Sequence, residues 1–257
     1  MPKEVREAMN RAQELARLKP WFERARDFSG WDLSKVRPRL IEPAPAWDYE
    51  TIVRQYGLGK RDALDMGTGG GELLARIREA LPARTTATEE WNVNAPIAKK
   101  RLAPLGVGIV RCRSLLLPFV ESAFDLVINR HEELEPREVA RVLSVGGHVV
   151  TQQVGRDNWS ELRSFFPMMT DFGDLYGDYV QGFEAAGLRI IRKDQHDHKV
   201  AYRDLGEIVF LLAISPWSFP RFSPERDLDA LLALESECLT DDGLVVTESR
   251  FLIIAEK

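Results

Sequence analysis

Apolar and polar residues follow two periods along this chain, and these periods predict its helices and strands. Between residues 62 and 154, short apolar runs alternate with amphipathic stretches. The runs predict strands at 62–67, 84–89, 107–112, 123–129 and 147–154, with helices at 71–80, about 95–103 and 135–143. This alternation indicates a mostly parallel sheet with right-handed crossovers. We therefore predict an α/β, doubly wound fold.

The segments on either side of this region predict further elements. Apolar residues between Val5 and Leu18 form one helical stripe, whereas the prolines and aromatic residues beyond Pro20 argue against regular structure. We expect residues 1–46 to form a helical and aromatic cap that acts as a lid. Residues 47–257 would form the main domain, beginning with a short helix that Asp48 caps. We predict helices at 158–166 and 178–186, a strand from Leu188, a last strand at 245–255, and a pocket-closing insertion at about 156–244.

A glycine-rich loop follows the first strand of the alternating region. The segment Asp65-Met66-Gly67-Thr68-Gly69-Gly70-Gly71-Glu72 passes from an apolar strand into a helix. Glycine permits positive φ and close approach of a ligand, and the following helix presents its N-terminal dipole. A dinucleotide fingerprint would require glycine at position 72, where this chain has Glu72. The loop therefore predicts a nucleotide-cofactor site of another type.

This loop and three later blocks resemble the class I S-adenosylmethionine-dependent methyltransferases. The blocks are Leu117-Pro118-Phe119, Phe124-Asp125-Leu126-Val127 and Arg141-Val142-Leu143-Ser144-Val145-Gly146-Gly147. The resemblance covers about residues 62–154 and implies a Rossmann-like, seven-stranded sheet, S-adenosyl-L-methionine as cofactor, and methyl transfer. It implies cofactor contacts from Asp65, Gly67, Thr68, Gly69 and Gly71.

Residues after the second and third strands are further candidates for cofactor binding. Glu89 lies 22 residues after Gly67 and can accept both ribose hydroxyls, with Glu90 as the alternative one residue away. Trp91 could cover the adenine. Many relatives have an acidic residue where this chain has Arg113, so we expect backbone groups near Arg113 and Ser114 to hold the adenine, with the Arg113 side chain pointing away.

The exit of the strand at 123–129 contains the candidate catalytic groups. His131 could act as a general base, oriented by Glu132 or Glu133. Asn129 and Arg130 could hold the methionine part of the cofactor or an anionic acceptor, although Asn129 capping the next element is the structural alternative. In the C-terminal half, Ile214–Pro220 could form one wall of an acceptor pocket.

Composition restricts the functional classes. The net charge is −5, although residues 1–40 contain ten Lys/Arg and six Asp/Glu. Two distant cysteines support neither a disulfide framework nor a thiolate metal site, and His196 and His198 have no evident third metal ligand. No apolar run is long enough to span a membrane. We expect a cytoplasmic enzyme without a metal site, leave its oligomeric state open, and predict methyl transfer to an O, N or C nucleophile of a small-molecule acceptor. The alternatives are an RNA methyltransferase that uses the basic cap and an NAD-dependent oxidoreductase.

Overall fold

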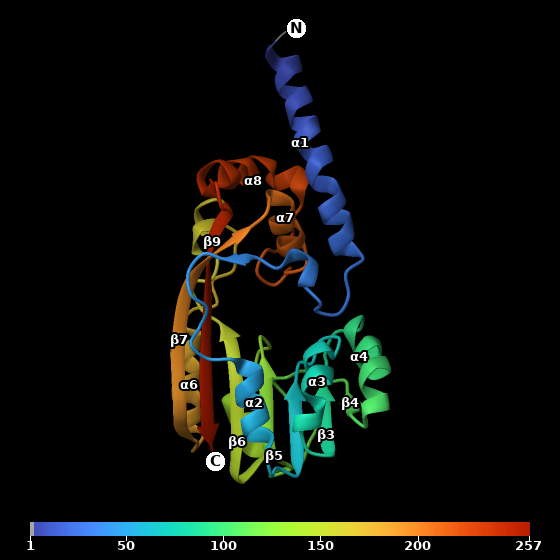
Figure 1. Ribbon diagram of the computed structural model, residues 1–257, viewed down its shortest axis with the longest axis vertical. Helices are drawn as coiled ribbons and strands as arrows, with labels where there is room; N and C mark the ends of the chain where they lie inside the picture. The colour runs from blue at the N-terminus through green and yellow to red at the C-terminus, as the bar shows by residue number, and fades with distance from the viewer. Residues whose placement is uncertain (1–2) are drawn as a thin grey trace.

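The computed structural model describes residues 3–257 and places one nine-stranded sheet at the centre of that part of the chain (Figure 1). The strands are β1 (Arg39–Leu40), β2 (Asp62–Met66), β3 (Arg84–Thr88), β4 (Gly108–Val110), β5 (Phe124–Arg130), β6 (Leu143–Val154), β7 (Arg189–Tyr202), β8 (Leu239–Thr240) and β9 (Gly243–Glu256). The α-helices are α1 (Lys3–Arg26), α2 (Tyr49–Gly57), α3 (Glu72–Ile77), α4 (Asn94–Leu102), α5 (Pro136–Val142), α6 (Leu175–Ala185), α7 (Leu205–Ala213) and α8 (Pro224–Cys238). Short 3₁₀ helices are η1 (Ser34–Val36), η2 (Arg78–Ala80), η3 (Ala103–Leu105) and η4 (Ser160–Ser164).

The strand order confirms the predicted doubly wound fold. The order across the sheet is β4-β3-β2-β5-β6-β9-β7, with β1 added beside β7 and β8 paired with β9. The five strands from β4 to β6 are parallel, whereas β9 is antiparallel to both β6 and β7. The chain therefore has the mixed sheet and strand order typical of Rossmann-like class I methyltransferases. The carboxyl ends of the parallel strands meet at one edge of this sheet.

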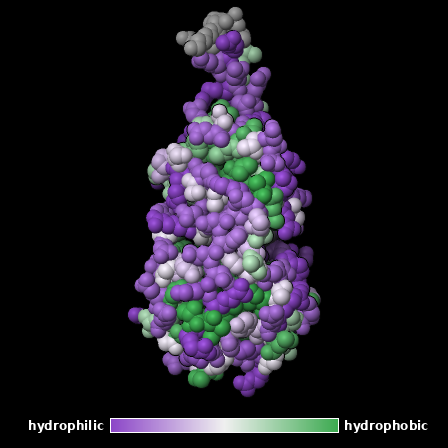
Figure 2. Space-filling model, turned by 60° about the vertical axis from the view of Figure 1, so that its left-hand side comes forward, coloured by the Kyte–Doolittle hydropathy of each residue, from purple (hydrophilic) through white to green (hydrophobic). Residues whose placement is uncertain are grey.

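A second lobe stands over that edge. Strands β7 and β9 each contain 14 residues and extend beyond their neighbours to carry α1, α7 and α8 (Figure 1). This lobe has its own hydrophobic core, which includes Leu18, Leu205, Leu231 and Val246. Two further cores cover the two faces of the lower sheet. Hydrophilic side chains dominate the face shown in Figure 2, where hydrophobic ones gather in separate areas of the upper and lower lobes.

Helix α1 is longer than the sequence predicts and belongs to the second lobe. It passes through Pro20 and ends at Arg26, so the prediction of irregular structure after Pro20 was wrong for these residues. An interior proline costs about 3 kcal/mol. Packing offsets this cost: Trp21 lies against Gly206 of α7, and the Phe22 ring packs on the edge of Phe222 with their centroids 6.2 Å apart.

Several other boundaries differ from the predictions. The Asp48 cap is present, and its carboxylate accepts a hydrogen bond from the Thr51 amide at 2.8 Å. The predicted helix at 158–166 is instead the short η4, because Trp159 has a left-handed φ of 55° just before it. Helices α7 and α8 were not predicted. Within residues 3–257, no helix is long and apolar enough to cross a membrane.

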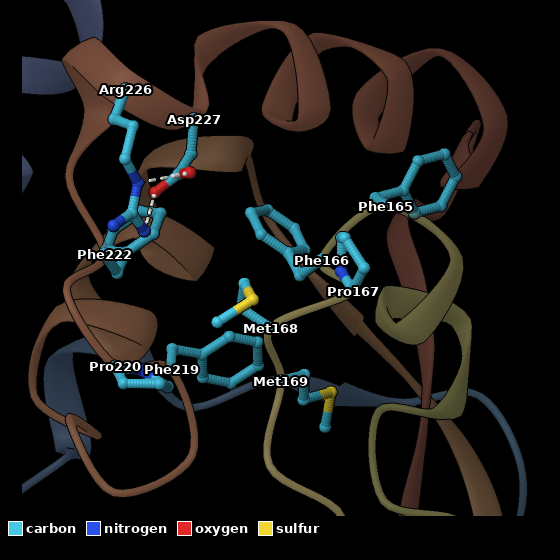
Figure 3. A pocket seen from close by; sticks show the side chains of 10 residues that line it. All are labelled: Phe165, Phe166, Pro167, Met168, Met169, Phe219, Pro220, Phe222, Arg226 and Asp227. Atoms are coloured by element: carbon cyan, nitrogen blue, oxygen red, sulfur yellow. Dashed lines mark hydrogen bonds and ion pairs between the residues drawn. The ribbon is translucent and has the colours of Figure 1, made fainter.

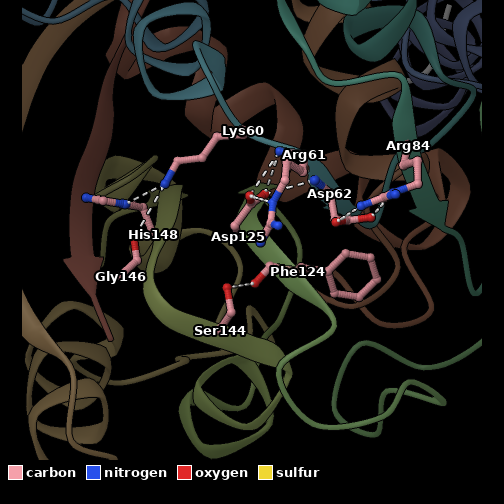
Figure 4. A network of polar contacts seen from close by, with 9 residues as sticks. All are labelled: Lys60, Arg61, Asp62, Arg84, Phe124, Asp125, Ser144, Gly146 and His148. Atoms are coloured by element: carbon pink, nitrogen blue, oxygen red, sulfur yellow. Dashed lines mark hydrogen bonds and ion pairs between the residues drawn. The ribbon is translucent and has the colours of Figure 1, made fainter.

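The amino ends of the parallel strands are fixed by a polar network on the side opposite the second lobe (Figure 4). The Asp125 carboxylate on β5 accepts hydrogen bonds from the backbone amides of Arg61 and Asp62. Lys60 lies 3.1 Å from the His148 ring nitrogen on β6. These contacts set the relative positions of β2, β5 and β6, and so determine where their carboxyl ends lie.

Candidate active site

The glycine-rich loop joins β2 to α3 in a left-handed backbone conformation that glycine adopts without strain. Gly67, Gly69 and Gly71 have φ values of 69°, 61° and 78°, and Gly71 is the N-cap of α3. The Thr68 amide donates to the Thr88 carbonyl at 2.9 Å, and the Gly67 amide donates to the Thr88 hydroxyl at 3.2 Å. The loop is thereby anchored to the end of β3. L-residues with side chains rarely adopt such φ values.

The loop glycines also permit close contact with side chains from distant parts of the chain. An ideal Cβ on Gly67 would lie 2.2 Å from Glu132 Cγ, and one on Gly69 would lie 2.2 Å from Trp31 Cδ1. A Cβ on Gly71 would lie 2.8 Å from the Leu102 side chain. In this structure the groups that approach the glycines are therefore side chains. The sequence had led us to expect close approach of a ligand at these glycines.

Glu89 lies just beyond β3, and its side chain turns inward. It is 4% exposed, and its carboxylate accepts hydrogen bonds from the Gly69 amide at 2.7 Å and the Trp91 amide at 2.9 Å. Glu90 turns to the surface, where the exposed Arg113 lies 3.6 Å from its carboxylate. Of these two acidic residues, Glu89 is therefore the one beside the glycine loop.

Three carboxyl groups around the loop are desolvated. Burial raises the pKa of Asp65 to about 6 and that of Glu132 to about 7, and the neighbouring Glu89 carboxylate adds to both rises. Burial also raises the pKa of Glu89. The Thr68 hydroxyl offsets part of the rise at Asp65, yet it is buried and makes no hydrogen bond of good geometry within residues 3–257. The three buried carboxyl groups favour a positively charged ligand, and the Thr68 hydroxyl favours one with a hydrogen-bonding group nearby.

Asn129 at the end of β5 is part of the sheet interior. Its side chain is fully buried, and its Oδ1 accepts from the Thr151 hydroxyl at 2.8 Å and from the Gln153 amide at 2.5 Å. Its Nδ2 donates at 3.5 Å to the Met66 carbonyl. These contacts hold the ends of β2, β5 and β6 together. Asn129 therefore has a structural role, but it joins three strands and does not cap the next element as the structural alternative expected.

His131 and Glu132 leave β5 in different directions. His131 has a left-handed φ of 60° and stays exposed, while Glu132 accepts a hydrogen bond from the buried Ser114 hydroxyl at 2.8 Å. The expectation that Glu132 or Glu133 orients His131 was wrong. Within the described chain the His131 ring contacts the Gln152 side chain, with 3.4 Å between their Nε2 atoms. The left-handed turn at His131 is the physical reason, because it rotates the two side chains apart.

Three tryptophans from distant segments meet beside the glycine loop. The rings of Trp31 and Trp217 have centroids 5.8 Å apart, and those of Trp91 and Trp217 are 5.6 Å apart. The backbone of Gly30 is held close by, because its amide donates to Asn94 Oδ1 at 2.9 Å. Trp31 belongs to the segment expected to act as a lid, but its contact with Gly69 was not predicted, since nothing local links it to a loop 38 residues away.

A cavity of about 250 Å³ lies in the second lobe (Figure 3). Its lining is mostly aromatic and sulfur-containing, and Phe166, Met168, Phe219 and Phe222 contribute to it. The segment Ile214–Pro220 therefore has two sides, since Phe219 lines this cavity while Trp217 reaches the tryptophans at the loop. The cavity is distinct from the loop, and the role of this segment as a wall of an acceptor pocket stays a prediction.

The His196 and His198 side chains share one face of β7, but each has another neighbour. The His196 ring nitrogen lies 2.9 Å from the Pro43 carbonyl, and His198 is buried 3.9 Å from the Glu248 carboxylate. No group of three His, Cys, Asp or Glu side chains within residues 3–257 could hold a metal ion.

Comparison with known proteins supports the architecture described above. Residues 64–151 match the sequence family described as "Methyltransferase domain". No curated protein matches the sequence.

Solved structures share the fold at low sequence identity. A protein from Bacillus halodurans, described as a putative methyltransferase, is 15% identical with a TM-score of 0.62, and the match covers 81% of this chain and 98% of that one. The [4+2]-cyclase SpnF is 16% identical with a TM-score of 0.54, covering 95% and 94% of the two chains. A geranyl diphosphate methyltransferase in complex with S-adenosylmethionine is 17% identical with a TM-score of 0.50, covering 80% and 83%.

Proposed function

Since residues 64–151 form a class I S-adenosylmethionine-dependent methyltransferase domain, we propose that this enzyme methylates an O, N or C nucleophile of a small-molecule acceptor. The observation that carries the proposal is the desolvated carboxyl cluster of Asp65, Glu89 and Glu132 around the glycine loop. Such a cluster suits a cationic ligand, and S-adenosylmethionine when bound supplies a methyl group on a positively charged sulfur.

The residues around the loop have separate tasks in this proposal. The Glu89 carboxylate, already fixed by two backbone amides, can still accept hydrogen bonds from ribose hydroxyls. Asp65 and Glu132 provide negative charge near the methionine part. Arg113, Ser114 and their neighbours would line the adenine side, where the Ser114 hydroxyl also holds Glu132 in place. These groups align and desolvate the reactants, and alignment supplies most of the catalysis expected for a direct displacement.

Removal of a proton from the acceptor is a further task that two groups could perform. Partial desolvation of the His131 ring and the positive charges of Arg250 and Arg130 lower its pKa well below the ordinary value, so the ring is neutral near pH 7. Glu132 has a pKa of about 7 and lies on Gly67. We propose that Glu132 accepts the proton when the acceptor requires it, because its pKa is closer to neutral pH.

The position of the second lobe supports a small acceptor. It lies over the carboxyl edge of the sheet, where a methyl group would project (Figure 1). One neighbour in fold is named for methylating geranyl diphosphate, a small molecule. In a cytoplasmic enzyme of this form, the acceptor would bind between the sheet edge and the second lobe.

Contacts of the N-terminal segment weaken the case for RNA as acceptor. Arg11 and Arg17 of α1 pair with Asp229 and Glu235 of α8, so part of the basic excess is neutralised. The aromatic residues of this helix pack inside the second lobe. Two of the ten basic side chains of residues 1–40 and the packed rings of this helix are therefore engaged within the protein, which leaves fewer groups to bind phosphates or stack on bases.

Transfer of a labelled methyl group tests the proposal. The protein is incubated with methyl-labelled S-adenosylmethionine and either a filtered small-molecule extract or total RNA. We expect label in the small-molecule fraction. Label in RNA would favour the RNA alternative. A melting temperature raised by NAD and unaffected by S-adenosylhomocysteine would favour the oxidoreductase alternative.

A further inference from the structure

Charged residues around the end of β5 divide into an acidic side and a basic side. The carboxyl groups near the glycine loop lie toward β2 and β3. Arg130 ends β5, and Arg250 lies on β9, on the other side of β6. The basic side therefore lies away from the loop and toward the strands that carry the second lobe.

The register of the sheet places both arginines on one face. Arg130 is opposite Gln152 on β6, Gln152 is opposite Leu252 on β9, and Arg250 is two residues from Leu252. Side chains of paired residues and of residues two apart point to the same face of a sheet. The positive charge of Arg250 lowers the pKa of Arg130, and the positive charges of both arginines lower the pKa of His131.

The Arg130 side chain has no ion-pair or hydrogen-bond partner within residues 3–257. Its guanidinium carbon lies 5.9 Å from the centre of the Tyr49 ring, and burial lowers its pKa, although the residue keeps solvent-exposed surface. The nearby carboxylates have other partners, since Asp48 caps α2 and Glu50 pairs with Arg76. Arg250, in contrast, is paired with Glu248 at 3.2 Å. The uncompensated charge on this side is thus at Arg130.

Contacts of Gln152 determine which nitrogen of His131 carries its proton. The Trp47 indole N–H can only donate, so the Gln152 side-chain atom that lies 2.9 Å from it must be the amide oxygen. The other end of the amide, which faces His131, is therefore the nitrogen. That nitrogen donates to His131 Nε2 at 3.4 Å. A neutral ring then carries its proton on Nδ1. His131 therefore presents a donor, and this suits contact with an anion better than the role of general base expected from the sequence.

We propose that Arg130 and His131 form a binding site for an anionic group, a carboxylate or a phosphate, of the methyl acceptor. This inference rests on the proposed methyltransferase function and adds the chemical class of the acceptor. A guanidinium without a partner and a neighbouring imidazole N–H supply the donors that such oxygens require. The location favours the acceptor over the carboxylate of the cofactor, because Arg130 lies over Tyr49 of α2 and is paired with Gln152 of β6, whereas the glycine loop follows β2.

Phosphate titration of the complete protein tests the proposal. The protein is saturated with S-adenosylhomocysteine, and the NMR signal of the His131 ring, identified by its loss in His131→Gln, is followed in phosphate and in chloride at equal ionic strength. Phosphate should raise the pKa of His131 in a saturable manner, because an adjacent anion stabilises the imidazolium. Arg130→Gln should weaken phosphate binding about ten- to hundredfold. Arg130→Lys should retain part of it, and Arg137→Gln, which changes an exposed arginine on α5, should leave it unchanged.

Calorimetry with S-adenosylhomocysteine separates the possible failures. Equal affinity for this compound in the wild type and Arg130→Gln, together with weaker phosphate binding in the variant, supports the proposal. A wild-type protein that binds S-adenosylhomocysteine but shows no phosphate effect on His131 overturns the anion site and leaves the methyltransferase function standing. A tenfold loss of S-adenosylhomocysteine affinity in Arg130→Gln would assign the guanidinium to the cofactor carboxylate, which also overturns it. No S-adenosylhomocysteine binding by the wild type would contradict the proposed function itself.

Discussion

Replacing Glu132 by glutamine should stabilise the protein in a pH-dependent manner. Burial raises the pKa of Glu132 from 4.5 to about 7, so the folded protein holds this proton more tightly than the unfolded chain does. The stability associated with the proton is present below pH 4.5 and is lost as the pH rises through about 7. At about 1.4 kcal/mol per tenfold change in proton affinity, the difference between the folded and unfolded pKa of Glu132 costs roughly 1 kcal/mol of folding free energy at pH 5 and about 3 kcal/mol at pH 8.

Glutamine removes this cost and can keep the contact with Ser114, because its amide oxygen can accept the same hydrogen bond. Urea unfolding without cofactor should show that Glu132→Gln gains about 2 kcal/mol more at pH 8 than at pH 5. Glu133→Gln is the matched control, since this adjacent side chain is exposed. An equal change in stability at both pH values, or destabilisation at pH 8, would refute the view that Glu132 is a desolvated carboxylate.

Three further predictions concern the cofactor site and the second lobe. Binding of S-adenosylmethionine at pH 6.5 should release protons, because its positive charge favours the ionised form of Glu132. Calorimetry in buffers of different ionisation enthalpy should detect this release, and Glu132→Gln should reduce it. Trp31→Ala should speed association of S-adenosylhomocysteine in stopped-flow measurements, because the indole covers Gly69, and an unchanged rate would show that the ring does not obstruct entry. Leu18→Ala should destabilise the protein by about 2–5 kcal/mol, because Leu18 is fully buried in the second lobe, whereas Met9→Ala, 49% exposed on the same helix, should change the melting temperature little.

The sequence was most informative where local chemistry determines structure. The Asp48 cap, the positive-φ glycines at 67, 69 and 71, and the order of strands and helices between residues 62 and 154 all follow from short-range rules. The inward position of Glu89 also agrees with its place at the end of a strand. Such features depend on neighbours in sequence, so a single chain suffices to predict them.

Helix α7 of the second lobe could not be predicted because its sequence has little periodicity. Nearly every residue of Leu205–Ala213 is buried, so α7 shows no polar face that would distinguish a helix from a strand. Helix α1 continues past Pro20 only because Trp21 and Phe22 find partners on distant elements. This packing also revises the expected effect of truncation: removing residues 1–46 should open the core of the second lobe, not release a separate lid.

The site itself depends on contacts between distant segments. Trp31 lies on Gly69, and Glu132 turns to Ser114 because of the left-handed φ at His131. No local pattern encodes either contact. The same is true of Arg130. Its side chain lacks an ion-pair partner within residues 3–257 because the nearby carboxylates bind other groups, Asp48 the Thr51 amide and Glu50 the Arg76 side chain.

Calorimetric titration of S-adenosylhomocysteine into the wild type, Glu89→Ala and Glu90→Ala tests most directly whether the glycine loop and Glu89 form the cofactor site. Glu89→Ala removes a buried carboxylate beside the loop, and loss of charge-assisted hydrogen bonds worth roughly 1.5–3 kcal/mol should weaken binding by about ten- to hundredfold. Glu90→Ala removes a surface carboxylate and should bind like the wild type. Circular dichroism of each variant controls for folding. Absence of binding by the wild type, or a larger loss in Glu90→Ala than in Glu89→Ala, would contradict the account.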